Sequence, residues 1–170
     1  SALIKFARLL PEDVNLEPIL AEVKEQLKQE ANYQQEIKHL LDFKNALQHH
    51  DEFHVPNVYK KVSSKHIIAM SYVDGITIDE IQSLSQPLRN KIVSDLLVLF
   101  FEELFEFRQM QSDPNFANYL YNAKDHQLVL LDFGATRTIP EHVSIGYQKL
   151  LSAALDGEKE AILNAAKDIG

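Results

Sequence analysis

Three oxygen-bearing side chains of the kind that bind cations lie close together in the second half of the chain. Asp113 and Asn118 are five positions apart in the segment QSDPNFANYL, and Asp132 follows in LVLLDFG after a short apolar stretch. Carboxylate and amide oxygens are ligands that hard cations such as Mg²⁺ accept. A loop that carries two donors, followed by a hairpin that returns the third beside them, would make all three converge on one small group. The spacing therefore indicates chemistry on a phosphoryl group with a divalent cation.

Each part of this pattern has a structural explanation when it is taken alone. Asp-Pro-Asn is a common turn or cap signal, and Asp-Phe-Gly can simply end a strand. Their order and spacing, however, match the catalytic loop and Asp-Phe-Gly motif of protein kinases. In that layout Asp113 orients or deprotonates the acceptor, while Asn118 and Asp132 hold Mg²⁺ on the nucleotide phosphates. Gln111-Ser112 replaces the usual His-Arg before the aspartate, so an ordinary protein kinase is not expected.

The elements that must position these residues follow helix and strand patterns in turn. Apolar periodicity, capping residues and turn residues define them. The order is helix, hairpin, helices, loop, hairpin, helices, which predicts an α+β fold rather than a parallel sheet of βαβ units. The predicted helices are 16–47, a short one that a Thr77/Glu80 capping box begins, 88–110 with Pro87 in its first turn, 142–155 and 158–167; the predicted strands are 58–62, 66–72, 119–121 and 127–131, with a turn at Asp74-Gly75.

Composition excludes several classes of function. A length of 170 residues suits one domain with a real core. The formal charge of −8 argues against a surface that binds nucleic acid. No cysteine is present, which excludes disulfides, thiolate metal sites and cysteine nucleophiles. The most apolar stretch, residues 92–107, contains four acidic residues and is too short to span a membrane.

At the level of motifs the chain closely resembles the UbiB-type atypical kinases, also called the aarF-domain-containing kinase family. The stretch QMQSDPNFANYLYNAKDHQLVLLDFGATR resembles the core motif of that family. EANYQQE, residues 30–36, resembles its Glu-x-Asp-Tyr-x-x-Glu segment, and VPNVYKKVSSKHIIAMSYVDGITIDE resembles the strands and connection between the kinase lobes. The resemblance implies a protein-kinase-like fold, with residues 1–73 as a partial N-terminal lobe and residues 74–170 as a helical, truncated C-terminal lobe.

The resemblance also implies roles for residues in the first lobe. Glu36 matches the helix glutamate that pairs with the nucleotide-binding lysine, and Glu30 matches an acid that helps to line the active site. The second acid of that motif is Asn32 here, which cannot supply a carboxylate to a cation.

Four residues match the connection between the lobes. Met70 falls at the gatekeeper position, and Ser71, Tyr72 and Val73 match the hinge whose backbone meets adenine. A plain apolar edge strand would explain Met70 equally well.

By the same resemblance, the cofactors are ATP or ADP and Mg²⁺, and the activity is ATP hydrolysis in support of ubiquinone or related prenyl-quinone lipid biosynthesis. The implied partners are lipid or quinone precursors, quinone-biosynthesis proteins and a membrane surface. The implied location is the cytoplasmic face of a bacterial inner membrane or the matrix side of the mitochondrial inner membrane. The lysine strand and alanine-rich loop of the family do not occur in the sequence, so we expect a fragment with feeble activity by itself.

Two alternatives remain from the sequence. One is a small-molecule phosphotransferase of the aminoglycoside- or choline-kinase type, although Gln111-Ser112-Asp113 does not match its His-x-Asp signature. The other is a pseudokinase scaffold that binds nucleotide or a partner without turnover. The retained Asp113, Asn118 and Asp132 argue against the scaffold, whereas Asn32 argues mildly for it.

Overall fold

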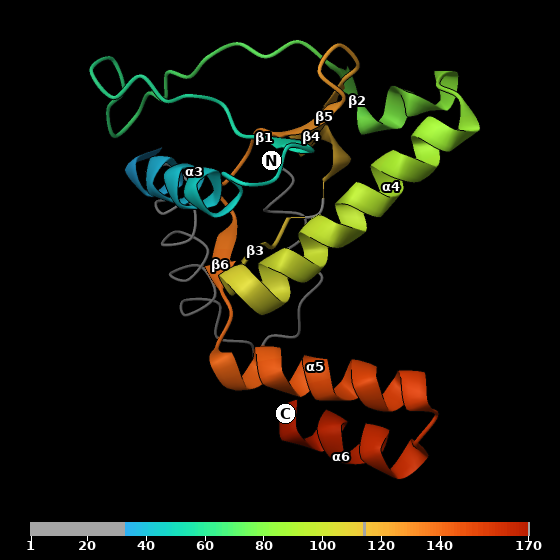
Figure 1. Cartoon of the computed structure of the whole chain (residues 1–170). Coiled ribbons are helices and arrows are strands. Elements are labelled where there is room, and N and C mark those ends of the chain that lie inside the picture. The colour runs from blue at the N-terminus through green and yellow to red at the C-terminus, as the bar shows by residue number, and fades with distance from the viewer. Residues whose placement is uncertain (1–32, 114, 170) are drawn as a thin grey trace, which may run out of the picture. The chain divides into compact units, whose positions relative to one another are not determined.

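Two small sheets and the helices packed on them carry the predicted site in a computed structural model, which describes residues 33–113 and 115–169 (Figure 1). The described helices are α3 (Tyr33–Ala46), α4 (Gln86–Phe101), α5 (Glu141–Asp156) and α6 (Lys159–Ile169), with two 3₁₀ segments, η1 (Ile78–Ser83) and η3 (Phe116–Asn118), and one π-helical segment, η2 (Glu102–Phe107). The strands are β1 (Phe53–His54), β2 (Ile76–Thr77), β3 (Gln109–Gln111), β4 (Tyr119–Asn122), β5 (Gln127–Leu130) and β6 (Thr136–Thr138).

The four-stranded sheet has the order β1-β5-β4-β2 and is built around the β4–β5 hairpin. In this hairpin Tyr119 pairs with Leu130 and Asn122 with Gln127. β1 adds to β5 in parallel, and β2 adds to β4 in antiparallel orientation. A second sheet consists of the antiparallel pair β3 and β6, in which Gln111 lies opposite Thr136. The chain thus enters the predicted loop from β3 and leaves the Asp-Phe-Gly into β6.

The hydrophobic core joins the four-stranded sheet to α3 and α4. Val129 and Leu130 of β5 are completely buried, as are Leu40 of α3 and Ile92 of α4. Phe133 of the Asp-Phe-Gly also belongs to this core. Burying such a side chain stabilises the fold by about 1.5–3 kcal/mol. The core therefore fixes the residues on either side of Phe133.

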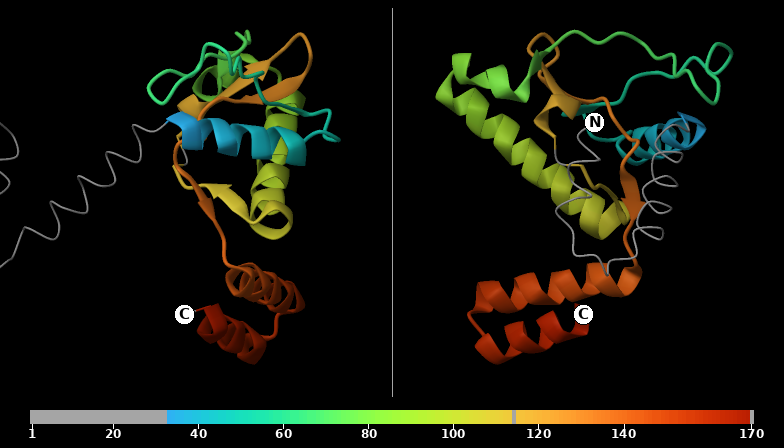
Figure 2. Two further views of the ribbon diagram at one scale, coloured as in Figure 1. Left: turned by 90° about the vertical axis from the view of Figure 1, so that its left-hand side faces the viewer. Right: turned by 180° about the vertical axis from the view of Figure 1, so that it is seen from behind.

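Several predicted elements are confirmed. The strands predicted at 119–121 and 127–131 are β4 and β5, and the two C-terminal helices are α5 and α6, which lie side by side in both views of Figure 2. The capping box is present, because the Glu80 carboxylate accepts a hydrogen bond from the Thr77 backbone N–H at 3.1 Å. The segment that it caps is 3₁₀-helical. For the helix predicted at 16–47, α3 confirms the part from Tyr33 to Ala46, and residues 16–32 lie outside the described residues.

The helix predicted at 88–110 is wrong at its C-terminal end. It begins at Gln86 with Pro87 in the first turn, as expected, but α4 ends at Phe101 and passes into the wider turn of η2. Arg108 then adopts a left-handed conformation with φ of 49°, which ends the helix. Met110 consequently lies in β3 rather than in the helix. No helix in the described part of the chain is both long enough and apolar enough to cross a bilayer.

The prediction of a hairpin from strands 58–62 and 66–72 is also wrong in part, because the pairing is much shorter than expected. The structure forms one antiparallel bridge, between Val58 and Met70, and no continuous ladder. The Ser63 hydroxyl accepts a hydrogen bond from the Ala69 N–H and donates one to the Tyr59 carbonyl, both at 3.0 Å. A side-chain hydroxyl therefore satisfies backbone groups that a ladder would have paired.

The predicted turn at Asp74-Gly75 is wrong as well, because this segment runs without a turn into β2. Glycine is needed there for another reason. A Cβ atom on Gly75 would lie 2.9 Å from the Leu120 Cβ and 3.0 Å from the Tyr121 carbonyl oxygen of β4. The absent side chain thus lets this part of the chain approach β4 closely.

We predict that Gly75→Ala lowers the free energy of unfolding by about 1–3 kcal/mol, because the new methyl group meets a Cβ and a backbone oxygen that cannot move aside. Urea unfolding of the two proteins measures the loss. Adding Leu120→Ala should not restore stability, since alanine keeps the Cβ that makes the contact. Full restoration by that second substitution would contradict the explanation.

Candidate functional site

Backbone hydrogen bonds join the predicted loop to the Asp-Phe-Gly segment at both ends. At one end, which we call the outer pairing, the Ser112 N–H and hydroxyl both donate to the Ala135 carbonyl oxygen, at 3.1 and 2.6 Å. At the other end, the inner pairing, the Leu131 N–H donates to the Asn118 carbonyl oxygen at 3.0 Å. Asp113 and Asp132 lie on the two segments between these pairings. The fold therefore brings Asp113, Asn118 and Asp132 into one region.

The loop has its own internal support. The Asn115 N–H donates to the Asp113 carbonyl at 2.8 Å, and the Asn115 side-chain oxygen accepts from the Ala117 N–H at 3.0 Å, which caps η3. Asn115 is thus used structurally, whereas the Asn118 side chain makes no hydrogen bond to any other described residue. The Asp113 side chain is exposed and that of Asn118 is half-buried. Both can reach a ligand.

The Asp-Phe-Gly segment combines one buried anchor with one exposed acid. Phe133 is completely buried, and its ring centroid lies 5.1 Å from that of Phe43 in α3. Asp132 is exposed, and one of its carboxylate oxygens accepts from the Gly134 N–H at 2.8 Å. The other oxygen is left for a ligand. The chain then turns at Gly134-Ala135 into β6.

Helix α3 places a second carboxylate beside Asp132. Burial raises the pKa of Glu36, the charge of Asp132 raises it further, and the Phe133 backbone N–H opposes both effects. The His39 ring nitrogen lies 3.2 Å from the Phe133 carbonyl oxygen and also ties α3 to this segment. No ion pair between described residues involves Glu36. A cation brought between the two carboxylates would favour the charged form of both.

The residues predicted to meet adenine lie away from this loop in sequence, on the strand-like segment before β2. Met70 packs against the core and bridges to Val58. The Ser71 N–H donates to the Asn57 carbonyl oxygen at 2.8 Å. Tyr72 is 89% exposed, and the backbone groups of Tyr72 and Val73 bond to no other residue that the structure describes. Glu30 and Asn32 lie outside the described residues.

The donor set is of a kind that fits Mg²⁺. Within residues 33–113 and 115–169, no three His, Asp or Glu side chains are grouped to hold a metal ion. Mg²⁺ commonly takes only one or two protein oxygens, and phosphate and water oxygens complete its shell. Asn118 and Asp132 can supply such a pair.

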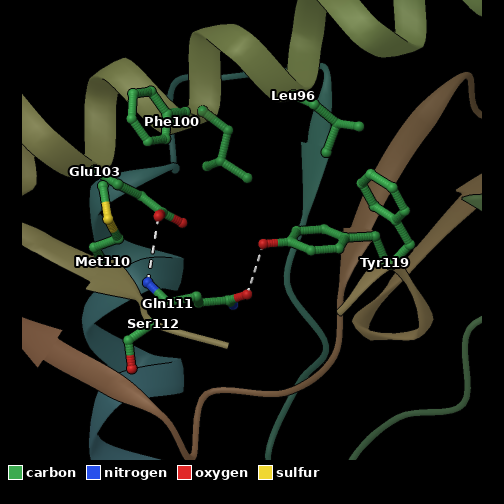
Figure 3. A pocket seen from close by; sticks show the side chains of 9 residues that line it. Leu96, Phe100, Glu103, Met110, Gln111, Ser112 and Tyr119 are labelled. Atoms are coloured by element: carbon green, nitrogen blue, oxygen red, sulfur yellow. Dashed lines mark hydrogen bonds between the residues drawn. The ribbon is translucent and has the colours of Figure 1, made fainter. Parts of the chain in front are cut away.

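A second polar cluster, which sequence reasoning missed, lies behind the loop (Figure 3). Glu103 of η2 is 4% exposed, and one of its carboxyl oxygens accepts from the Gln111 N–H at 3.3 Å. The Gln111 side-chain oxygen accepts from the Tyr119 hydroxyl at 2.8 Å. Burial raises the pKa of Glu103 to about 8, against a smaller opposing effect of the Gln111 N–H. The sequence offers only a weak signal, because residues 92–107 contain four acidic residues and nothing in their spacing singles out Glu103.

We predict that Glu103→Gln removes a loss of stability that the wild type shows as the pH rises from about 4.5 to about 8. The folded chain holds the Glu103 proton up to about pH 8, whereas the unfolded chain releases it near 4.5, so this contribution to stability is complete below pH 4.5 and is lost as the pH rises through 8. Between these limits the unfolding free energy of the wild type should fall relative to the variant by roughly 3 to 5 kcal/mol.

Urea unfolding at several pH values measures this difference. Glu106→Gln is the matched control, because Glu106 lies on the same segment with an exposed side chain. Its curve should run parallel to that of the wild type. If the Glu103→Gln curve also runs parallel, Glu103 is not protonated in the folded chain.

Comparisons with known proteins agree with this architecture. The profile of the ABC1 atypical kinase-like domain matches residues 1–166. The chain is 38% identical over 168 residues to the atypical kinase COQ8B, mitochondrial, of Rattus norvegicus, and 33% identical over 168 residues to the atypical kinase COQ8, mitochondrial, of Saccharomyces cerevisiae. Each match covers 99% of this chain but 32% and 34% of the relatives. The chain therefore spans about a third of the length of these proteins.

Solved structures show the same fold. The complex structure of Rv3197 with erythromycin from Mycobacterium tuberculosis superimposes with a TM-score of 0.76 over 93% of this chain and 40% of the other. The two sequences are 21% identical, so the likeness concerns the fold alone. The α+β, kinase-like fold expected from the sequence is confirmed.

Proposed function

The chain belongs to the ABC1 atypical kinase-like domain family, and from that premise we propose that it forms the phosphate-binding side of a Mg²⁺–ATP site that hydrolyses ATP or transfers its terminal phosphoryl group. The observation that carries the proposal is the pair of backbone pairings that holds Asp113, Asn118 and Asp132 in one region. Three oxygen donors on two joined segments suit a small, highly charged ligand.

In this proposal each of the three residues has a different task. The exposed carboxylate of Asp113 orients a water molecule or hydroxyl acceptor and receives its proton. The Asn118 side-chain oxygen and the free oxygen of Asp132 hold Mg²⁺, which would neutralise charge on the phosphates. Because the Gly134 N–H already occupies one Asp132 oxygen, the other is fixed in direction before a ligand arrives.

Glu36 has a positioning role in the proposal. Its carboxylate lies close enough to Asp132 for the charge of Asp132 to raise its pKa. A basic side chain or a cation at this place would relieve the repulsion between the two acids. We therefore assign Glu36 to pairing with the cationic side chain that binds the nucleotide phosphates. For Glu30, which lies outside the described residues, the proposed role is the one that the family resemblance implies.

Adenine would bind at the hinge. The backbone N–H and carbonyl groups of Tyr72 and Val73 have no partner among the described residues and can serve as donors and acceptors to a base. Met70 packs against the core just before them, at the position of a gatekeeper, and Ser71 is fixed to Asn57. Because adenine would be recognised through backbone atoms, this recognition does not depend on the side chain of Ser71.

We place the activity in ubiquinone or related prenyl-quinone lipid biosynthesis, because relatives that are 38% and 33% identical to this chain carry the COQ8 name. They are also named as mitochondrial proteins, which favours the matrix side of the mitochondrial inner membrane over a bacterial location. Lipid or quinone precursors and proteins of that pathway are the proposed partners.

We predict that Asp113→Asn and Asp132→Asn separate catalysis from binding in the full-length protein. Asp113→Asn should reduce phosphate release from ATP by roughly 100-fold or more while Mg²⁺–ADP still binds, because only the acceptor loses its base. Asp132→Asn should weaken Mg²⁺–nucleotide binding itself, because a metal ligand loses its charge. Phosphate release and calorimetric titration measure the two effects.

Asp156→Asn is the matched control, since Asp156 is exposed near the end of α5 and outside the proposed site. It should behave as the wild type. Nucleotide binding without turnover in the wild type would favour a pseudokinase scaffold, and turnover that requires an amino alcohol or aminoglycoside would favour a small-molecule phosphotransferase. Unchanged activity in both variants would contradict the assigned roles.

A further inference from the structure

A cavity of about 450 Å³ lies behind the loop, between α4, η2, β3 and β4 (Figure 3). Its walls are mainly apolar, and Leu96, Phe100 and Met110 form part of them. Ser112, the residue before Asp113, also lines it. The volume is large enough for a small organic molecule with an aromatic ring.

Two polar atoms in this cavity are buried without a partner in the described part of the chain. Glu103 and Gln111 are 4% and 8% exposed, and both line the cavity. One carboxyl oxygen of Glu103 accepts from the Gln111 N–H, but the other, Oε1, makes no hydrogen bond to any residue that the structure describes. The Gln111 side-chain oxygen accepts from Tyr119, but its nitrogen, Nε2, has no acceptor within residues 33–113 and 115–169. Buried polar atoms are normally hydrogen-bonded, so each orphan calls for an explanation.

We propose that this cavity is a binding site for a neutral, mainly apolar molecule with one oxygen acceptor, a carbonyl or hydroxyl oxygen that accepts hydrogen bonds from Gln111 Nε2 and from the carboxylic acid of Glu103. The apolar body fills the space between Leu96, Phe100 and Met110. The oxygen satisfies the two orphaned groups. The site is separate from the proposed nucleotide site and does not rest on it.

Charge and protonation explain why the ligand is neutral. No lysine or arginine among the described residues lines the cavity, so these residues offer a buried anion no counter-charge. Glu103 itself is a donor at neutral pH, because burial holds its pKa near 8. The titratable group that faces it from β4 is Tyr119, whose pKa is raised by burial and by the charges of Glu103 and Asp113. Tyr119 thus stays neutral, and binding should weaken as Glu103 ionises.

The two methionines of the chain allow a direct test. Met110 lines the cavity, whereas Met70 lies at the bridge to Val58 and does not. In the 170-residue chain labelled with ¹³C at the methionine methyl groups, acetophenone and benzyl alcohol supply a carbonyl and a hydroxyl oxygen on an aromatic body. Toluene lacks the oxygen, and benzoate carries a charge.

At pH 7, acetophenone and benzyl alcohol should shift the Met110 methyl signal and leave that of Met70 in place. Their affinities should exceed that of toluene at least tenfold, and benzoate should not bind. If one of the two oxygen classes alone binds, it identifies the class of the acceptor. An unchanged Met110 signal, or equal affinities for toluene and acetophenone, would overturn the proposal.

Substitutions test the two donors separately. Gln111→Leu should bring the affinity for acetophenone to less than tenfold above that for toluene, because only the Glu103 donor remains. Glu103→Gln keeps a donor in the same place, so acetophenone should still bind. Its affinity should then no longer fall between pH 7 and 9, as it does in the wild type. Glu106→Gln, on the exposed side of η2, should change nothing. Thermal unfolding and the Met70 signal show that each variant is folded, and tenfold tighter binding of acetophenone than of toluene in folded Gln111→Leu would refute the role of Gln111.

Discussion

The site depends on the backbone hydrogen bonds that join the loop to the Asp-Phe-Gly segment at both ends. The Ser112–Ala135 pairing continues the small β3–β6 sheet, and the Asn118–Leu131 pairing continues the β4–β5 hairpin. Each sheet thus fixes one end of the loop, and the buried ring of Phe133 fixes the segment opposite. Exposed side chains between these points need no packing of their own to stay close together. The Asp132 side chain can therefore keep a fixed orientation although it is exposed.

Two polar clusters lie close together in sequence, one with exposed acids that suit a cation and one with a buried acid that keeps its proton. Asp113 and Asp132 are exposed and suited to binding a cation, whereas Glu103 is buried and keeps its proton to about pH 8. Gln111 lies between Glu103 and Asp113 in sequence. Its backbone N–H donates to the Glu103 carboxyl group, and its side-chain oxygen accepts from the Tyr119 hydroxyl. Environment, rather than residue type, distinguishes the proposed phosphate site from the proposed site for a neutral ligand. A ligand in the cavity would contact Ser112, which forms the outer pairing, and could in this way affect the position of the loop.

Much of this architecture could be predicted from local patterns, because β4, β5, α5 and α6 carry their own periodicity and turn residues. Strands β1, β3 and β6 could not be, since each has only two or three residues and exists through a partner distant in sequence. Gly75 was assigned to a turn because its contact with β4 is not visible locally. Asp113, Asn118 and Asp132 are predicted from their spacing and from the family resemblance, both of which are visible in the sequence, and their roles stay a prediction. The cavity was missed because burial of Glu103 depends on β3 and β4 together.

The central claim is that Asn118 and Asp132 hold one divalent ion on a nucleotide. A crystal structure of the full-length protein with Mg²⁺ and a non-hydrolysable ATP analogue tests it most directly. We expect one oxygen from each side chain at about 2.0–2.1 Å from the same Mg²⁺, with the Asp113 carboxylate facing the terminal phosphate. A nucleotide-bound structure in which the ion contacts neither side chain, or in which the nucleotide lies away from residues 112–118, would contradict the account.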